Sequence, residues 1–272
     1  MYDYIFLALA KNCSKYLNNY FYFINKLSKT KKVLVIVGED SSTDDTYKIL
    51  IEQKKKINLV VIKTKSISKF KSRLKRLSLG RQILKDYINK KKYKSKLIVV
   101  NDLDEIFKKK ISLKNFLKIS NILQKNNKFL FGISVKSKPF YYDLLVLKIK
   151  DVFEYDVLKI QKSYSIKSIL QRISIISNYK RKITYMDDLK SISSYNGMCI
   201  YIFEDYQKGS YISKGKKNIY NNIDHLSLNL GIHSRTKKYI LISNTLNLFT
   251  PKQHLPKNLI QLLYYNFIKK FI

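Results

Sequence analysis

Tryptophan is absent from the 272 residues, and proline and glycine are scarce, with three and seven copies. So few prolines and glycines argue against a long flexible linker between independent domains. The two cysteines, Cys13 and Cys199, are too few and too far apart for a disulfide framework or a zinc site. Their sparse use is typical of a reducing interior, so we expect a cytoplasmic protein.

Long hydrophobic runs are also missing. No apolar stretch reaches the ~18 residues that a membrane-spanning helix requires. The N-terminus, "MYDYIFLALAKN", lacks both the basic start and the apolar length of a signal peptide. The C-terminal segment, residues 251–272, is apolar and basic, and we expect it to cap the core, with a membrane surface as the alternative. The expected protein is therefore soluble, or peripheral at a membrane.

Acidic residues are scarce, since 19 Asp and Glu face 54 Lys and Arg and the net charge is +35. Such an excess favours a nucleic-acid partner as one hypothesis. However, Lys, Asn, Ile and Tyr are abundant together while Trp, Gly and Pro are few, which is the bias of an AT-rich genome. Lysine then fills solvated positions by default. We therefore expect no nucleic-acid partner, and keep a basic nucleic-acid-binding protein as the alternative.

Three common catalytic motifs are absent: a glycine-rich phosphate loop, a nucleophile elbow and a spaced set of zinc ligands. Their absence argues against P-loop enzymes, classical dinucleotide oxidoreductases and the common serine hydrolases.

What the sequence does contain, over its first 135 residues, is an alternation of short apolar strands and amphipathic helices. This alternation predicts a mostly parallel sheet covered by helices on both faces. Ligands of such sheets bind beyond the carboxyl ends of the strands. Strands are predicted at 4–10, 32–37, 57–63, 96–100 and 129–135, and helices at 11–29, after Ser41 or Ser42, at 70–88 and at 111–123.

The second half is less regular. Apolar runs predict strands at 141–149, 196–203 and 237–243, and the isoleucine spacing of 165–177 predicts a helix. The segment 220–233, "YNNIDHLSLNLGIH", is mixed in character.

The stretch "VVNDLDEIF", residues 99–107, reverses the local charge of this basic chain. Asp102 and Asp104 follow a predicted strand, and in a turn both carboxylates can reach one hard cation. Mg²⁺ and Mn²⁺ prefer oxygen ligands and are often held by one or two carboxylates plus substrate phosphates. The alternative is a helix cap, with Asp104 capping and Glu105 favouring the helix dipole.

A second acidic strand end, Glu39–Asp40, belongs to the same predicted edge of the sheet. A carboxylate there can accept hydrogen bonds from a nucleobase or a ribose. The alternative is an ordinary turn in which Ser41 or Ser42 caps the next helix and Asp44 and Asp45 occupy its first turn.

Arg81 falls on the apolar stripe of the helix predicted at 70–88. Burying an unpaired guanidinium is very costly, so this residue needs an anionic partner. The partner is either a protein carboxylate or an anion in a cleft, and a diphosphate suits the guanidinium fork. The sequence leaves both alternatives open.

Two further sites stand out in the second half. His225 lies beside Asp224, a pair that can complete a metal site or supply a base, although a lone histidine is more often structural. Asn196–Gly197 marks the entry of a predicted strand and is typical of a simple turn.

Taken in order, these motifs resemble the GT-A glycosyltransferases. The opening "FLALAKNCSKYLNNYFYFINKL" is similar to their first strand and helix, and "VIVGEDSSTDDTYKIL" to their acidic turn. "VVNDLDEI" stands in the place of their metal-binding Asp-x-Asp motif.

A narrower similarity links the chain to the cryptococcal capsule mannosyltransferase family. It is carried by "RLKRLSLGRQILKDYI", "VVNDLDEIF", "YYDLLVLK" and "SSYNGMCIY". The chain departs from that pattern at Gln82, where the family has Asn, at Tyr195 before Asn196–Gly197, and at "IDH" in place of Cys-Glu-His.

The resemblance implies a fold and a set of site residues. The fold is a GT-A, Rossmann-like α/β domain with a nucleotide-sugar-binding half (1–135), a less regular acceptor-binding half (136–250) and an amphipathic C-terminal segment (251–272). The implied substrate contacts are Asp40 with the nucleoside, Arg81 with the donor diphosphate, and Asn196 and Gly197 with the donor sugar or the acceptor.

The same resemblance implies a bound Mn²⁺ or Mg²⁺. Asp102 and Asp104 would hold it, His225 would be a third ligand, and Asp224 is the candidate catalytic base.

The expected function is the metal-dependent transfer of a hexose from a GDP- or UDP-linked donor to a glycan, glycolipid or glycoprotein. A nucleotidyltransferase with a related α/β sheet is a further alternative, but its usual glycine-rich N-terminal loop is missing. A non-catalytic relative is disfavoured because all the expected acidic residues are present.

Overall fold

The computed structural model describes residues 1–149, 179–180, 182–212 and 223–255. The helix predicted at 165–177 lies outside the described residues, as do residues 256–272 of the C-terminal segment 251–272.

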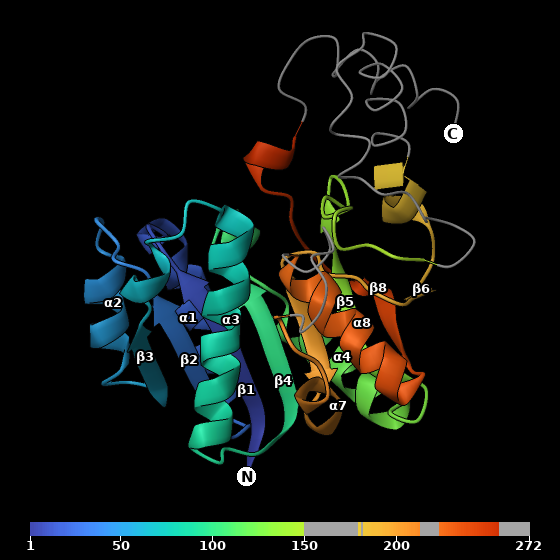
Figure 1. The fold of residues 1–272 in the computed structure, drawn as a ribbon, viewed down its shortest axis with the longest axis horizontal. Helices are drawn as coiled ribbons and strands as arrows, with labels where there is room; N and C mark the ends of the chain where they lie inside the picture. Colours follow the sequence, from blue (N-terminus) through green and yellow to red (C-terminus); the bar gives the residue numbers. More distant parts are fainter. Residues whose placement is uncertain (150–178, 181, 213–222, 256–272) are drawn as a thin grey trace, which may run out of the picture.

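One sheet runs through the described part of the chain (Figure 1). Its strands lie in the order β3-β2-β1-β4-β7-β5-β8-β6. The five strands predicted in the first half all form, within a few residues of their expected ends. The strand bounds are β1 Tyr2–Ala10, β2 Val33–Glu39, β3 Leu59–Lys63, β4 Ser95–Asp102, β5 Leu130–Lys138, β6 Leu189–Ser191, β7 Met198–Ile202 and β8 Tyr239–Phe249.

The sheet is mostly parallel, as the sequence predicts. β1 pairs in parallel with β2 and β4, β2 with β3, and β5 with β8. β7 is the exception inside the sheet, because it lies antiparallel between β4 and β5. β6 is antiparallel at the edge. Because β7 comes from the predicted acceptor half, the two halves share one sheet.

Helices cover both faces of the sheet. α1 (Ser14–Ser28), α2 (Thr46–Gln53) and α4 (Leu113–Lys125) pack on one face, and α3 (Arg73–Lys90) and α8 (Asp224–Thr236) on the other (Figure 1). Successive strand residues point to opposite faces. In β1, Phe6 therefore packs with Phe116 of α4, while Ile5 belongs to the cluster that contains Leu84 of α3.

Two local predictions differ from the structure. α2 begins at Thr46 with Asp45 at its N-cap, so the predicted serine cap is wrong. The Ser42 hydroxyl instead accepts from the Asn12 backbone amide, 3.1 Å away, and ties the first two strand–helix turns together.

The strand predicted at 141–149 is also absent, since this apolar run makes isolated bridges at residues 148 and 149, with Ser193 opposite Lys148, and no ladder. Its side chains are buried without a ladder, in a cluster that includes Tyr141 and Leu147. The mixed segment 220–233 contributes the first part of α8.

No helix among the described residues is long and apolar enough to cross a bilayer.

Candidate active site

A cleft of about 760 Å³ lies at the carboxyl ends of β1, β2 and β4. Its position follows from the parallel topology, because the strand ends of an open α/β sheet leave a crevice at that edge. Six of the eight residues predicted from the sequence line it, namely Asp40, Arg81, Asp102, Asp104, Asp224 and His225. Asn196 and Gly197 are not among its lining residues.

Arg81 is the buried centre of the cleft wall, with only 5% of its surface exposed. Its Nη2 lies 2.7 Å from Oδ1 of Asp102, and its Nε lies 2.6 Å from Oδ2 of Asp224. Of the two alternatives left by the sequence, the structure thus shows protein carboxylates as the partners. A single guanidinium thereby joins α3, the end of β4 and the start of α8.

Asp102 and Asp104 stand on either side of Leu103 in the cleft. Oδ1 of Asp102 accepts from Arg81 and, at 3.1 Å, from the Tyr195 hydroxyl. Oδ1 of Asp104 accepts from the Ile106 amide at 3.1 Å and caps the short 3₁₀ helix η2 (Glu105–Phe107), so the predicted capping role is confirmed. Within the described part of the chain, neither carboxylate has a hydrogen-bond partner for its second oxygen.

The environment of Asp104 favours a cation. Burial, followed by the nearby negative charge of Asp102, raises the pKa of the Asp104 carboxyl to about 7. Two crowded carboxylates with free oxygens are a suitable donor set for Mg²⁺ or Mn²⁺, with the remaining positions left to water and substrate phosphate. These two residues therefore fit the predicted metal.

His225 is packed as an aromatic side chain. Its ring stacks on Tyr195 with centroids 3.5 Å apart, and its Nδ1 lies 3.3 Å from the Tyr201 hydroxyl. Burial, and then the charge of Arg81, lowers the pKa of its imidazole well below the usual range, so the ring is neutral. Nε2 is buried without a hydrogen-bond partner.

The described residues contain no group of three or more His, Cys, Asp or Glu side chains arranged to hold a metal. His225 is thus not gathered with the two aspartates into such a group, and its role as a ligand stays a prediction.

Asp40 carries an unused acceptor into the cleft. Its Oδ2 lies 3.1 Å from Nζ of Lys11, whereas its Oδ1 is buried without a hydrogen-bond partner. A buried acceptor left unpaired costs free energy until a donor reaches it. This geometry suits a hydroxyl or amide donor on a bound molecule.

Asn196 and Gly197 lie behind the cleft wall and support it. The fully buried Asn196 accepts at Oδ1 from the backbone amides of Tyr142 (3.0 Å) and Asp143 (3.3 Å). The Gly197 carbonyl accepts from the Asp102 amide at 2.9 Å and from the Tyr195 hydroxyl at 3.1 Å. Their predicted contact with substrate stays a prediction, and their observed role is to fix neighbouring lining residues.

Sequence reasoning missed several lining residues. Asp143 lies in the cleft, and burial, followed by the charges of Asp224 and Asp102, raises its pKa to about 8. The available signal was a lone acidic residue inside the apolar run 141–149, which resembled a strand. Tyr142 and Tyr195 lie within or beside motifs quoted for the family resemblance, but they were given no role in the site. The other lining residues that were given no role are Lys11, Arg73, Arg76 and Lys180.

The cleft gathers much of the chain's scarce acid. Among the described residues, its lining contains five acidic and five basic side chains: Asp40, Asp102, Asp104, Asp143 and Asp224 with Lys11, Arg73, Arg76, Arg81 and Lys180. A groove that tracks a nucleic-acid backbone would instead be positively charged.

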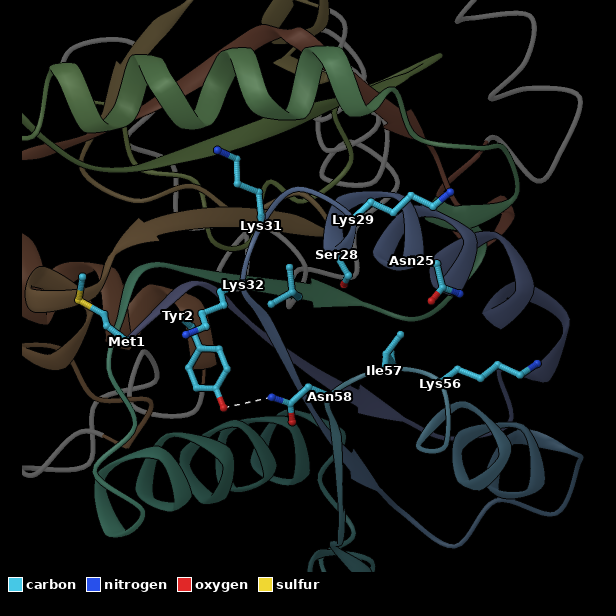
Figure 2. Close-up of a pocket in the computed structure, with 11 residues that line it drawn as sticks. Met1, Tyr2, Asn25, Ser28, Lys29, Lys31, Lys32, Lys56, Ile57 and Asn58 are labelled. Carbon is cyan, nitrogen blue, oxygen red and sulfur yellow. Dashed lines mark hydrogen bonds between the residues drawn. The ribbon is translucent and has the colours of Figure 1, made fainter.

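A second concavity of about 640 Å³ lies at the opposite, amino-terminal edge of β1 and β2 (Figure 2). It is bordered by exposed Lys29, Lys31, Lys32 and Lys56, close to where α1 and α2 end. Lysines near helix C-termini compensate the negative end of the helix dipole, so they have a structural explanation. Among the described residues, no acidic side chain lines this concavity.

No protein-family model and no curated protein sequence matches the chain. Solved structures do match it. S. aureus TarS (residues 1–349) superposes with a TM-score of 0.51 at 11% identity, over 91% of this chain and 60% of that one. The same protein in complex with UDP-GlcNAc gives 0.51 at 12% identity, over 94% and 60%. A Pyrobaculum calidifontis mannosyltransferase in complex with GDP-Man and Mn²⁺ gives 0.48 at 10% identity, over 99% and 64%.

This chain thus spans about 60% of the length of those TarS structures. These matches do not confirm the narrower similarity to the cryptococcal capsule mannosyltransferase family, which stays a prediction. The eight-stranded mixed sheet, its two helical layers and the TarS superposition together show that the chain has the α/β fold of the GT-A glycosyltransferases.

Proposed function

We propose that this chain is a metal-dependent glycosyltransferase that moves a hexose from a nucleotide-sugar donor to a glycan, glycolipid or glycoprotein. One observation carries the proposal. Asp102 and Asp104 lie in one cleft, and each has a carboxylate oxygen without a hydrogen-bond partner among the described residues. Asp40 lines the same cleft, and its buried Oδ1 is an unpaired acceptor. The shared GT-A fold supports it, because ligands of such sheets bind at this edge.

Donor binding is assigned to three parts of the cleft. Asp40 accepts a hydrogen bond from the nucleoside, whose approach satisfies the buried Oδ1. Asp102 and Asp104 hold Mn²⁺ or Mg²⁺ against the diphosphate. Arg81 lies behind Asp102 and adds positive charge to that side of the cleft.

In the proposed reaction, these residues stabilise the negative charge that develops on the leaving group. Breaking the bond between sugar and phosphate leaves negative charge on the nucleoside diphosphate. A bound divalent cation supplies Lewis-acid stabilisation of that charge. Arg81 is pre-oriented by its two carboxylate partners, so it needs no reorganisation when the charge develops.

The donor is tested by a thermal-shift screen of GDP, UDP, GDP-mannose, UDP-glucose and UDP-GlcNAc, each with and without Mn²⁺. A ligand that binds only the folded state raises the melting temperature by mass action. We expect one nucleotide family to raise it only when the metal is present. If no nucleotide stabilises the protein in either condition, the proposal fails.

The metal site is tested by Asp104→Ala. Loss of one of two carboxylate ligands should abolish the Mn²⁺-dependent shift and donor turnover while the fold is retained. Asp3→Ala is the matched control, since Asp3 lies at the opposite end of β1 from the cleft, where it pairs with Lys96 and accepts from the Lys32 backbone amide. Unchanged turnover in Asp104→Ala, or equal loss in the control, would contradict the assignment.

A further inference from the structure

The five carboxyl groups that line the described part of the cleft differ in their ion-pair and hydrogen-bond partners. Asp40 pairs with Lys11, and Asp102 and Asp224 both pair with Arg81. Asp104 caps η2 and crowds Asp102. Within the described residues, Asp143 is the one cleft carboxyl with neither an ion pair nor an assigned metal.

The position of Asp143 is fixed from behind. Its backbone amide and that of Tyr142 both donate to Oδ1 of Asn196. The Asn196 amide nitrogen in turn donates to the Ser137 hydroxyl at the end of β5, 2.9 Å away. Asp143 itself is half-buried, so it lines the cleft while its backbone is held by the sheet.

Asp224, which the sequence resemblance assigned as the base, is occupied differently. Its Oδ2 contacts Nε of Arg81, and its Oδ1 accepts from the His225 amide at 2.8 Å. A carboxylate with both oxygens engaged is a poor proton acceptor, because protonation would break a buried ion pair. Its geometry is that of a residue that positions Arg81.

We infer that Asp143 is the general base that takes the proton from the attacking hydroxyl group. This inference rests on the proposed glycosyltransferase function and names a further catalytic residue for it. In the step, the hydroxyl O–H bond breaks and its proton passes to the Asp143 carboxylate. The hydroxyl oxygen forms a bond to the anomeric carbon. The bond from that carbon to phosphate breaks, and its electron pair leaves with the nucleoside diphosphate.

The electrostatic surroundings of Asp143 suit this role. Burial and the charges of Asp224 on α8 and Asp102 on β4 favour proton uptake by Asp143, whereas Arg81 on α3, Lys180 and the backbone amide of Val146 oppose it. A separate protein base is needed when the acceptor attacks from the face opposite the leaving group. The assignment therefore implies direct displacement with inversion at the anomeric carbon.

The test uses the full chain with Mn²⁺ and whichever of UDP-GlcNAc, UDP-glucose and GDP-mannose gives the largest thermal shift. Water serves as the acceptor, and release of nucleoside diphosphate is measured. Asp143→Asn keeps the size of the side chain but cannot accept the proton. We expect its turnover to fall by ~10²-fold or more, the usual contribution of a general base, with donor affinity changed less than about threefold.

Asp224→Asn is the matched comparison in the same cleft. Because it disturbs Arg81, we expect weaker donor affinity as well as slower turnover. Normal turnover in Asp143→Asn with intact donor binding would overturn the base assignment while leaving the proposed function standing. Absence of nucleotide binding by the unaltered protein would instead refute the proposed function.

A second measurement does not depend on how any variant folds. Proton NMR of the sugar released by the unaltered protein from an α-linked donor, recorded before mutarotation, gives the configuration of the initial product. Initial release of the β-anomer supports Asp143 as the base. Initial release of the α-anomer shows retention and overturns the assignment.

Discussion

Gly197 must be glycine for two reasons: its backbone is left-handed, and no space is left for a side chain. Its φ is +83°, and a Cβ added there would lie 2.6 Å from the Tyr142 hydroxyl and 2.8 Å from Ile106. Its carbonyl also holds the Asp102 amide and the Tyr195 hydroxyl. The turn predicted from Asn196–Gly197 is real, but only the structure shows that it supports two cleft residues.

Gly197→Ala should therefore destabilise the protein by at least ~1–3 kcal/mol, the cost of a strained backbone, with added cost from the clash. Gly231→Ala is the control, because its new Cβ meets nothing closer than 3.6 Å and alanine favours a helix such as α8. Urea unfolding should show opposite signs for the two variants. Equal effects would contradict this account of Gly197.

Asn196 acts on the cleft through the backbone of Tyr142 and Asp143. Asn196→Ala should lower kcat because the 142–143 segment loses its anchor, while the donor affinity measured by calorimetry changes little, because Asn196 does not line the cleft. A large loss of donor affinity with normal kcat would favour the predicted direct substrate contact instead.

At the scale of elements, Arg81 joins α3, β4 and α8. Removing the guanidinium leaves Asp102 and Asp224 close together and unpaired. Arg81→Ala should cost ~3–5 kcal/mol of unfolding free energy, the range for breaking one side of a buried ion pair.

Lys96→Ala removes an exposed ion pair with Asp3 and should cost no more than ~1 kcal/mol. Chemical denaturation of both variants in metal-free buffer measures the contrast. Comparable losses would show that Arg81 is not a buried connector.

The element pattern explains what the sequence could predict. Strands such as Val33–Glu39 and helices such as Ser14–Ser28 are specified by local periodicity, so they were predictable, as was the acidic edge at Asp102. The insertion of β7 between β4 and β5 is a long-range pairing with no local signal. The run 141–149 looked like a strand because its apolar residues are buried, yet they pack without a ladder.

The partners of Arg81 illustrate the same limit within the site. Because Arg81 lies on the apolar face of α3, the sequence required an anionic partner beside it. Asp102 and Asp224 are far from Arg81 in the sequence, so the sequence could not favour them over a bound diphosphate. Asp143 was missed for the related reason that its segment has no regular period.

At the scale of the whole molecule, the raised pKa of Asp143 predicts a pH trend. In the metal-free protein, where no cation offsets the charge of Asp102, the folded state keeps the Asp143 proton up to about pH 8, whereas the unfolded chain loses it near the ordinary value of 3.8. The folded state binds the extra proton between these values, so this group's contribution to stability falls as pH rises from about 4 to 8.

Metal-free melting temperatures at pH 5 and pH 8 test this trend. The decline should be smaller in Asp143→Asn than in the unaltered protein. Asp3→Asn is the control, because hydrogen bonding to Lys96 lowers the Asp3 pKa and leaves this group ionised at both pH values. An identical decline in all three proteins would contradict the raised pKa.

The charge distribution of the molecule predicts its response to salt. The net charge of +35 is spread over the chain, while the described cleft lining has as many acidic as basic side chains. Donor turnover should therefore change less than about threefold between 50 and 200 mM NaCl. Any nucleic-acid binding through many phosphate contacts should weaken by ~10³-fold or more over that range. A steep loss of turnover with salt would contradict a balanced cleft.

The placement of β7 also bears on how the chain folds as it leaves the ribosome. β4 ends at Asp102 and β5 at Lys138, but the strand that fills the gap between them begins only at Met198. Until that strand emerges, two facing edges carry open backbone groups, a known hazard for association between nascent chains. A fragment truncated at residue 149 should therefore aggregate, although it contains the whole run of strands that looks like a self-sufficient unit.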